Sequence, residues 1–209
     1  MSDFMQLPIL YSFRRCPYAM RARMALLLAG IQVELREVVL RDRPAHMMEI
    51  SPKGTVPVLL LPNGDVIEES MDIMLWSLDE SFLAGDWEDL VKGNDGQFKH
   101  HLDRYKYNNR YENPLEPEEH RSYVVEFLEE YNQRLSETAF LCGDICSIAD
   151  YALAPFVRQF ANTDRIWFDA LPYPHLHRWL SEILESDVFR NCMVKHPQWN
   201  ESDEPVLFG

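Results

Sequence analysis

The chain has 209 residues and a formal net charge of −14 at pH 7, with 46% hydrophobic and 26% charged residues. This balance is ordinary for a globular protein large enough to bury a substantial core, and the strong negative charge argues against general nucleic-acid binding. No secretory signal is evident and the longest apolar runs are too short for a membrane span, so we expect a cytoplasmic protein without a nucleic-acid or membrane partner.

A short strand is predicted first, over Ile9–Phe13, and the two residues before Cys16 are arginines. A helical pattern begins at Pro17, where proline is well placed because the first helical N–H has no partner to lose. Cys16 is therefore the predicted N-cap, with its sulfur near unpaired N–H groups and the positive end of the helix dipole. This setting favours the thiolate and makes Cys16 a candidate nucleophile. The alternative is a small buried cysteine, against which the polar, cationic flank argues.

Four arginines lie within ten residues that contain no acid, namely Arg14, Arg15, Arg21 and Arg23. Acidic residues dominate the C-terminal half of the chain. A positive pocket on a negative body would attract a small anionic ligand. A solvated helix face explains the same arginines equally well, and the sequence leaves both interpretations open.

Residues 1–83 are predicted to form a mixed α/β domain. The predicted elements after the first strand are a helix over Pro17–Ala29, a strand over Val33–Leu40, a short helix or turn at Pro44–Ile50, a hairpin of Val56–Leu61 with Val66–Glu68, and a helix from Ser70. The β-α-β order requires a parallel strand pair with a right-handed crossover. The Asn-Gly turn of the hairpin adds an antiparallel edge.

Residues 88–209 are predicted to form a second, all-helical domain after a linker at 84–88. The expected helices are Asn94–Tyr111, Glu118–Leu135, Ile148–Phe160 and His175–Leu184, and no strand is expected in this part. Ser147 and Asp150 form a capping-box pattern before the third of these helices. We interpret both as structural residues.

The remaining cysteines, Cys142, Cys146 and Cys192, are expected to be reduced thiols. No metal site is predicted, because the spacing of Cys142 and Cys146 is not a zinc pattern and the paired histidines have no evident third ligand.

Five motifs follow one another in the order typical of a known family: Cys16-Pro-Tyr-Ala19, Arg41-Asp-Arg-Pro44, Gly54-Thr-Val-Pro-Val58, Glu69-Ser70 and Ser147-Ile-Ala-Asp-Tyr151. With these motifs the sequence resembles the cytosolic glutathione transferases over nearly its whole length. Within them it is most similar to the cysteine-type, omega-like enzymes and their bacterial relatives. The resemblance implies an α/β thioredoxin-like N-terminal domain, an all-α C-terminal domain, glutathione as co-substrate and no metal.

The resemblance also assigns a glutathione site. Pro57 would be a cis-proline that turns the Val56 backbone outward, so that Val56 pairs with glutathione like an added strand. The alternative is an ordinary proline in an edge strand. Pro57 and Val56 therefore join Cys16 as candidate site residues.

Glu69 and Ser70 lie where a strand gives way to a helix. The N–H groups and hydroxyl at this point suit the γ-glutamyl carboxylate, and Glu69 suits its ammonium group; the alternative is an ordinary helix cap. Arg43 falls where omega-like enzymes place a cation near the glycine end of the tripeptide, with Arg41 and Lys53 as other candidates.

A hydrophobic substrate pocket in the helical domain would be lined by aromatic residues, among them Tyr107 and Tyr111, with Phe13 contributed by the first domain. Tyr105 and Phe160 are further candidates. Aromatic residues at helical spacing are more often part of a core, which is the alternative interpretation.

The implied reaction is a monothiol cycle, because Ala19 occupies the position of the second cysteine in a Cys-x-x-Cys pair. We expect thioltransferase or dehydroascorbate reductase activity on a disulfide, glutathionylated or small hydrophobic substrate. Tyr11 and Ser12 could instead activate glutathione, as a transferase that conjugates electrophiles requires. A third possibility is a non-catalytic relative that binds a protein partner, like the stringent starvation proteins with RNA polymerase.

The family also implies a homodimer, with Met71 and Trp76 on the probable contact helix.

Overall fold

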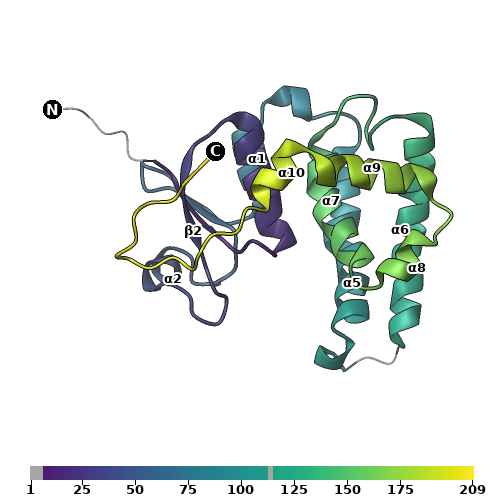
Figure 1. Cartoon of the computed structure of the whole chain (residues 1–209), viewed down its shortest axis with the longest axis horizontal. Helices are drawn as coiled ribbons and strands as arrows, with labels where there is room; N and C mark the ends of the chain where they lie inside the picture. The colour runs from purple at the N-terminus through teal and green to yellow at the C-terminus, as the bar shows by residue number, and fades with distance from the viewer. Residues whose placement is uncertain (1–6, 113–114) are drawn as a thin grey trace. The chain divides into compact units, whose positions relative to one another are not determined.

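The computed structural model describes residues 7–112 and 115–209 and divides the chain into two compact units (Figure 1). The first unit combines the chain up to Asp79 with Asp187–Gly209, and the second is Glu80–Ser186. Residues 1–6 of the predicted first domain lie outside the described residues.

The first unit is built on a mixed five-stranded sheet. Strands β1 (Ile9–Ser12) and β2 (Val33–Glu37) are parallel neighbours, as predicted. Strand β3 (Val58–Leu60) runs antiparallel to β1 and forms a hairpin with β4 (Val66–Ile67). The order across the sheet is β4-β3-β1-β2-β5, where β5 (Leu207–Phe208) is contributed by the end of the chain.

Alternation along β1 divides the core of this unit between the two faces of the sheet, because successive strand side chains point to opposite sides. Leu10 packs with Ala22 and Leu26 of α1 (Pro17–Ala29), whereas Tyr11 packs with Met47 of α2 (Ala45–Ile50). Helix α1 contacts α3 (Ser70–Ser77) and α10 (Asp187–Cys192). It is therefore a central, largely buried helix, and its N-terminal end is held between packed elements.

The end of the chain differs from the predicted helical domain over 88–209. Residues 187–209 belong to the first unit, and β5 is a strand where none was expected. Figure 1 shows this segment, in yellow, returning past β2 and α2. The Leu35 N–H donates to the Val206 carbonyl at 2.8 Å, and Phe208 packs into the core. The segment thus satisfies the backbone groups on the outer edge of β2, which the sequence pattern alone does not reveal.

The second unit is helical, in agreement with the prediction. Its α-helices are α4 (Trp87–Gly93), α5 (Lys99–Lys106), α6 (Pro117–Glu137), α7 (Ile148–Ala161), α8 (Arg165–Asp169) and α9 (Pro174–Glu185). The single helix predicted over Asn94–Tyr111 is instead a π-helical turn, α5 and a 3-10 turn in succession. Helix α6 packs against α5 and α9.

The predicted capping box of α7 is confirmed. The fully buried Asp150 carboxylate accepts hydrogen bonds from the Ser147 N–H at 2.8 Å, the Leu141 N–H at 2.9 Å and the Trp179 indole at 2.8 Å. Asp150 therefore joins the start of α7 to the preceding loop and to α9, which is the structural role expected for it.

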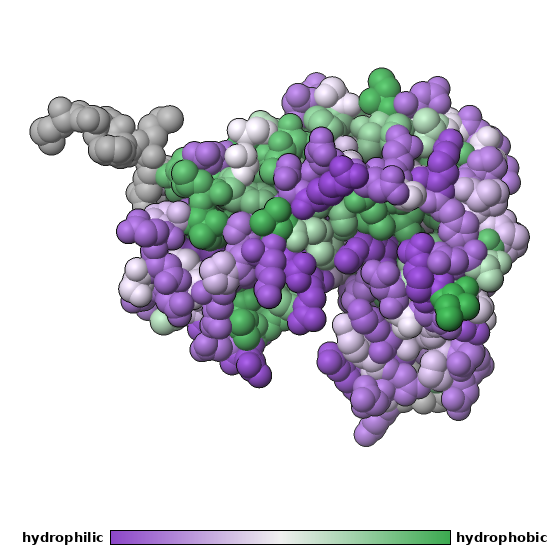
Figure 2. Space-filling model, viewed as in Figure 1, coloured by the Kyte–Doolittle hydropathy of each residue, from purple (hydrophilic) through white to green (hydrophobic). Residues whose placement is uncertain are grey.

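Hydrophilic side chains cover most of the face shown in Figure 2. Across residues 7–112 and 115–209, no helix is long and apolar enough to cross a membrane. In the same ranges, no group of three or more His, Cys, Asp or Glu side chains is arranged to hold a metal ion.

Candidate functional site

Cys16 is the N-cap of α1, as predicted. Its backbone is extended, with φ −77° and ψ 123°, and Pro17 follows as the first helical residue. The Cys16 N–H donates to the Phe13 carbonyl at 2.9 Å, which closes a tight turn between β1 and α1. The side chain is partly exposed. The thiol is thus held at the positive end of a helix dipole, where negative charge on sulfur is stabilised.

Val56 lies directly beside this thiol. The Cys16 Sγ is 3.7 Å from the Val56 carbonyl oxygen, within hydrogen-bonding distance for sulfur. The Val56–Pro57 peptide bond is cis, as the resemblance implied. Within the described residues, the Val56 N–H has no hydrogen-bond acceptor. A backbone donor next to the thiol is therefore available to an extended peptide.

Ser70 begins α3, with Glu69 as its N-cap. The Ser70 hydroxyl is nearly buried and accepts a hydrogen bond from Arg21 of α1 at 3.4 Å. Arg21 and Arg23 are both 0% exposed, so neither the positive-pocket nor the solvated-face interpretation fits them. They are internal cations that hold α1 to its neighbours.

The predicted cations near the glycine end have different partners. The Lys53 Nζ pairs with Glu69 at 2.5 Å and lies 3.8 Å from Glu68, and its hydrogen bond to Glu69 raises the pKa of Lys53. The Arg43 Nε donates to the Gly54 carbonyl at 2.6 Å, while the residue itself is exposed. Arg41 is exposed as well. Glu69, expected to meet an ammonium group, thus already contacts one from Lys53.

Tyr11 is not placed to activate glutathione. It is 0% exposed, and its hydroxyl is bonded to His46 Nδ1 and to Arg36, each at 2.7 Å. Burial raises the pKa of the Tyr11 phenol above its ordinary value. Ser12 is also fully buried. Of the side chains of Tyr11, Ser12 and Cys16, the one that is partly exposed is therefore the Cys16 thiol.

The residues predicted for a substrate pocket are divided between the units. Phe13 lies in the first unit, with the Arg15 guanidinium 5.4 Å from its ring centre. In the second unit, Arg110 lies 4.2 Å from the Tyr107 ring and Arg104 lies 4.5 Å from the Tyr111 ring. Phe160 is 1% exposed and packs against Tyr105, so Phe160 is a core residue, as the alternative interpretation held.

Glu37 was missed by sequence reasoning. It ends β2 and accepts a hydrogen bond from the Arg14 N–H at 2.6 Å, two residues before Cys16. A signal was present, because Val33, Leu35 and Glu37 alternate onto one face of the strand. A carboxylate at a core-facing position is rarely buried without a specific partner.

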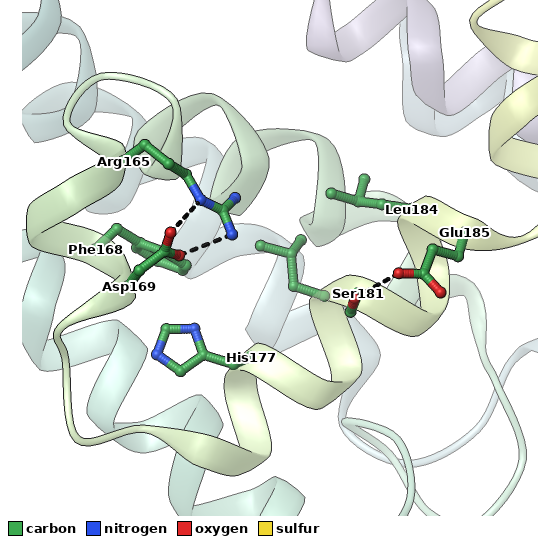
Figure 3. A pocket seen from close by; sticks show the side chains of 8 residues that line it. Arg165, Phe168, Asp169, His177, Ser181, Leu184 and Glu185 are labelled. Carbon is green, nitrogen blue, oxygen red and sulfur yellow. Dashed lines mark hydrogen bonds and ion pairs between the residues drawn. The ribbon is translucent and has the colours of Figure 1, made fainter.

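A separate cavity of about 320 Å³ lies between α8 and α9 in the second unit (Figure 3). Its polar side chains are paired with one another: Arg165 forms an ion pair with Asp169 at 2.8 Å, and the Ser181 hydroxyl donates to Glu185 at 2.9 Å. None of the predicted site residues lines it. The surroundings of Cys16 therefore stay the candidate site, and this cavity is not part of it.

Family models match both parts of the chain: the glutathione S-transferase N-terminal domain over residues 10–83 and the C-terminal domain over residues 100–182. Similar curated proteins include a probable glutathione transferase of Aplysia californica, 44% identical over 26% of this chain and 60% of that protein. Another is glutathione S-transferase omega-1 of Rattus norvegicus, 40% identical over 34% of this chain and 30% of that protein. The matched stretches thus span less than two thirds of either relative.

A similar solved structure is a glutathione transferase family member of Pseudomonas fluorescens with two glutathione bound. Its TM-score is 0.76 at 19% identity, covering 92% of this chain and 94% of that one. This likeness shows the shared fold. Together with the two domain matches and the cysteine-containing turn beside a cis-proline, it leads to one conclusion: the chain belongs to the glutathione S-transferase superfamily.

Proposed function

We propose that this protein is a glutathione-dependent thiol transferase of the omega-like, cysteine type, with Cys16 as its nucleophile. The observation that carries the proposal is the position of the Cys16 thiol at the N-terminus of α1, 3.7 Å from the carbonyl of the residue before cis-Pro57. The similarity to omega-1 transferase supports the subclass.

Glutathione would bind as an extended strand against Val56, whose carbonyl oxygen lies 3.7 Å from the Cys16 sulfur. Backbone pairing of this kind holds a peptide in register without side-chain contacts. The γ-glutamyl end would reach the start of α3 at Glu69 and Ser70, where helix N–H groups suit a carboxylate. The glycine carboxylate would meet Arg43, whose Nε is already oriented by the Gly54 carbonyl. Lys53 would neutralise Glu69 until the substrate ammonium replaces it.

The reaction would proceed in two disulfide exchanges. The Cys16 thiolate attacks the glutathione sulfur of a glutathionylated substrate; the substrate sulfur leaves as a thiolate and takes up a proton from water. A second glutathione, as its thiolate, then attacks the glutathione sulfur of the mixed disulfide. Oxidised glutathione forms and the Cys16 thiolate is restored. Ala19 offers no resolving thiol, so the cycle needs only Cys16.

The second candidate is conjugation of glutathione to an electrophile. The match to omega-1 transferase spans 34% of this chain, and the family models over both domains are those of glutathione S-transferases in general. Against conjugation, Tyr11 is buried and engaged by His46 and Arg36. The third candidate, a non-catalytic relative, requires that glutathione not bind at all.

The deciding experiment is intact-protein mass spectrometry after incubation with oxidised glutathione, for the wild type, Cys16→Ala and the control Cys142→Ala. We expect one glutathione adduct in the wild type and in Cys142→Ala, none in Cys16→Ala, and removal of the adduct by reduced glutathione. Thioltransferase turnover should fall at least a hundredfold in Cys16→Ser, because a hydroxyl cannot form the mixed disulfide.

Other results of these experiments would contradict the proposed thiol-transferase mechanism. An adduct that persists in Cys16→Ala, or full turnover in Cys16→Ser, contradicts the mechanism. High turnover with an aryl halide and negligible disulfide exchange would select conjugation instead. Absence of glutathione binding by calorimetry would favour the non-catalytic candidate.

We also propose a homodimer that uses α3, where Leu75 and Trp76 are 41% and 42% exposed. Two large apolar side chains one after the other on an exposed helix surface fit a contact with a second copy.

A further inference from the structure

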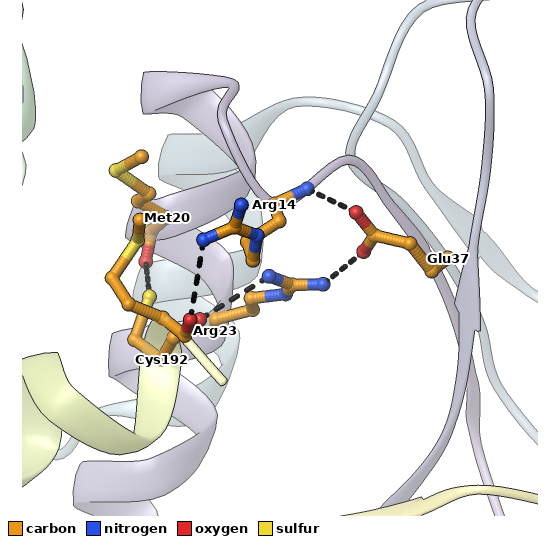
Figure 4. Close-up of polar contacts among 6 residues, drawn as sticks. Arg14, Met20, Arg23, Glu37 and Cys192 are labelled. Atoms are coloured by element: carbon orange, nitrogen blue, oxygen red, sulfur yellow. Dashed lines mark hydrogen bonds and ion pairs between the residues drawn. The ribbon is translucent and has the colours of Figure 1, made fainter. Parts of the chain in front are cut away.

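A single carboxylate ties the turn before Cys16 to the body of the first unit. Glu37 ends β2 opposite Ser12, the last residue of β1, and is 9% exposed. One of its oxygens accepts the Arg14 N–H at 2.6 Å, and the other accepts a hydrogen bond from the Arg23 guanidinium. Figure 4 shows the Glu37 carboxylate facing both donors, with one oxygen directed at each. Both oxygens are therefore engaged, each by a different part of the chain.

The two arginines extend this network to the end of α10. Arg23, which is 0% exposed, donates to the Cys192 carbonyl at 3.2 Å, and Arg14 donates to the Met193 carbonyl at 3.5 Å (Figure 4). Arg23 lies seven residues after Cys16, which is two turns along the same face of α1. Glu37 thus connects the turn, the face of α1 below the thiol and the C-terminal segment.

Two backbone hydrogen bonds lie at the ends of the turn. The Val38 N–H donates to the Ser12 carbonyl at its beginning, and the Cys16 N–H donates to the Phe13 carbonyl at its end. Between them, the Glu37 carboxylate accepts a hydrogen bond from the backbone N–H of Arg14. Because Cys16 is the N-cap, the direction of its Cα–Cβ bond follows from the backbone of this turn. A shift of the Arg14 peptide would therefore move the sulfur relative to Val56.

We infer that Glu37 is a positioning residue for Cys16. Its carboxylate fixes the Arg14 peptide, and its hydrogen bond from the buried Arg23 guanidinium holds that carboxylate in place. The role is to hold the sulfur in line with a disulfide bound along Val56. The inference rests on the proposed function, since it concerns the geometry of attack by Cys16 on bound glutathione.

Glu37→Gln is the informative substitution, because it keeps the size of the side chain but offers one acceptor where two donors converge. One of the two donors, either the Arg14 N–H or the Arg23 guanidinium, would then face the NH2 group of the glutamine, which is also a donor. The matched control is Glu34→Gln, on the same strand, which removes a carboxylate that pairs with Arg36 at 2.7 Å. Within the described part of the chain, the Glu34 carboxylate bonds to Arg36 and not to the turn.

Two rates at Cys16 are then compared by mass spectrometry of its peptide. Glutathionylation by oxidised glutathione requires a sulfur aligned with a bound disulfide, whereas alkylation by iodoacetamide requires only an accessible thiolate. For Glu37→Gln we expect glutathionylation to slow about tenfold, with alkylation changed less than twofold. The KM for glutathione should stay within about twofold while kcat falls. Glu34→Gln should match the wild type in both rates.

Equal rates for Glu37→Gln and the wild type overturn the inference, and so does an equal slowing of both reactions, which would indicate a general loss of structure. If Glu37→Gln does not fold, hydrogen exchange of the Arg14 amide in the wild type decides: protection supports the contact with Glu37, and exchange at the rate of an unstructured peptide overturns it. Failure of the wild type to form any Cys16 adduct would refute the proposed function itself and is recognised separately.

Discussion

The helix that begins after Cys16 carries two arginines whose side chains are buried in the protein. Arg21 and Arg23 lie fully buried on α1, where Arg21 contacts Ser70 and Arg23 pairs with Glu37. A buried cation is tolerated only when an acceptor accompanies it, because desolvation otherwise outweighs any gain. The arginines therefore set the spacing of α1 from β2 and α3, on which the position of the thiol depends.

Gly54 permits a prediction at this scale. Its φ is +61°, and an added Cβ would lie 3.1 Å from the Met48 sulfur and 3.3 Å from Arg43 Cδ. Gly30 has nearly the same φ, +63°, but nothing within 4 Å. Both alanine variants should lose about 1 kcal/mol for the left-handed backbone. Gly54→Ala should lose up to about 1 kcal/mol more, because the neighbouring side chains must move aside.

Urea unfolding of the two variants measures this difference. Since Arg43 is one of the side chains displaced, Gly54→Ala should also raise the KM for glutathione severalfold, whereas Gly30→Ala should leave it unchanged. Equal stabilities and equal KM values for the two variants would show that the space beside Gly54 is not restrictive.

Between elements, the contact of α5 with α6 contains a pair of buried histidines. His101 Nδ1 and His120 Nδ1 are 2.7 Å apart, and Tyr123 stacks on His101 with ring centres 4.3 Å apart. One ring must donate and the other accept, so the accepting ring is neutral and the two cannot both be protonated in this arrangement. Burial, followed by the nearby His100, His120 and Arg104, lowers the pKa of His101 to about 4, and burial with Arg104 and His100 lowers that of His120.

From this histidine pair we predict that the free energy of unfolding decreases as the pH falls from about 6.5 to about 4. Below the ordinary histidine pKa of about 6.5 the unfolded chain binds protons that the folded chain does not, down to the folded pKa of about 4. Between pH 7.5 and pH 5.0 the free energy of unfolding should fall by about 1 to 2 kcal/mol from these groups.

Urea unfolding at the two pH values tests this, with a His101→Gln/His120→Gln double variant as the comparison. The variant should lose correspondingly less stability on acidification, because glutamine does not titrate. The same pH dependence in both proteins would mean that other groups cause it. The measurement concerns only the α5–α6 contact and is independent of the chemistry at Cys16.

For the whole molecule, the surface of α3 bears on the proposed homodimer. Trp76→Glu would place a charge on the exposed apolar surface formed with Leu75 and should convert a dimer to a monomer, measured as mass by light scattering across a range of concentrations. Ile166→Glu is the matched control, since Ile166 is 88% exposed in the second unit. A monomeric wild type, or a dimer unaffected by Trp76→Glu, contradicts this interface.

Local patterns in the sequence were enough for several features. Proline after Cys16 predicted the start of α1, alternation predicted the strand β2, and the Ser147–Asp150 spacing predicted the cap of α7. Each of these depends on residues within a few positions of one another, so that backbone preference and side-chain periodicity are sufficient.

Local sequence patterns did not indicate three other features. These are the burial of Arg21 and Arg23, the hydrogen bond between Tyr11 and His46, and the return of residues 187–209 to β2. Arg23 and Cys192 meet across 169 positions of the chain, and Arg14 and Glu37 across 23. Such contacts arise because folding brings donors and acceptors together from distant segments and removes water from both. The spacing of residues along the sequence does not indicate such contacts. Cys16 could be chosen as a candidate from its own neighbours, and alternation placed Glu37 on the core-facing side of its strand, but the partners of Glu37 became known only from the folded chain.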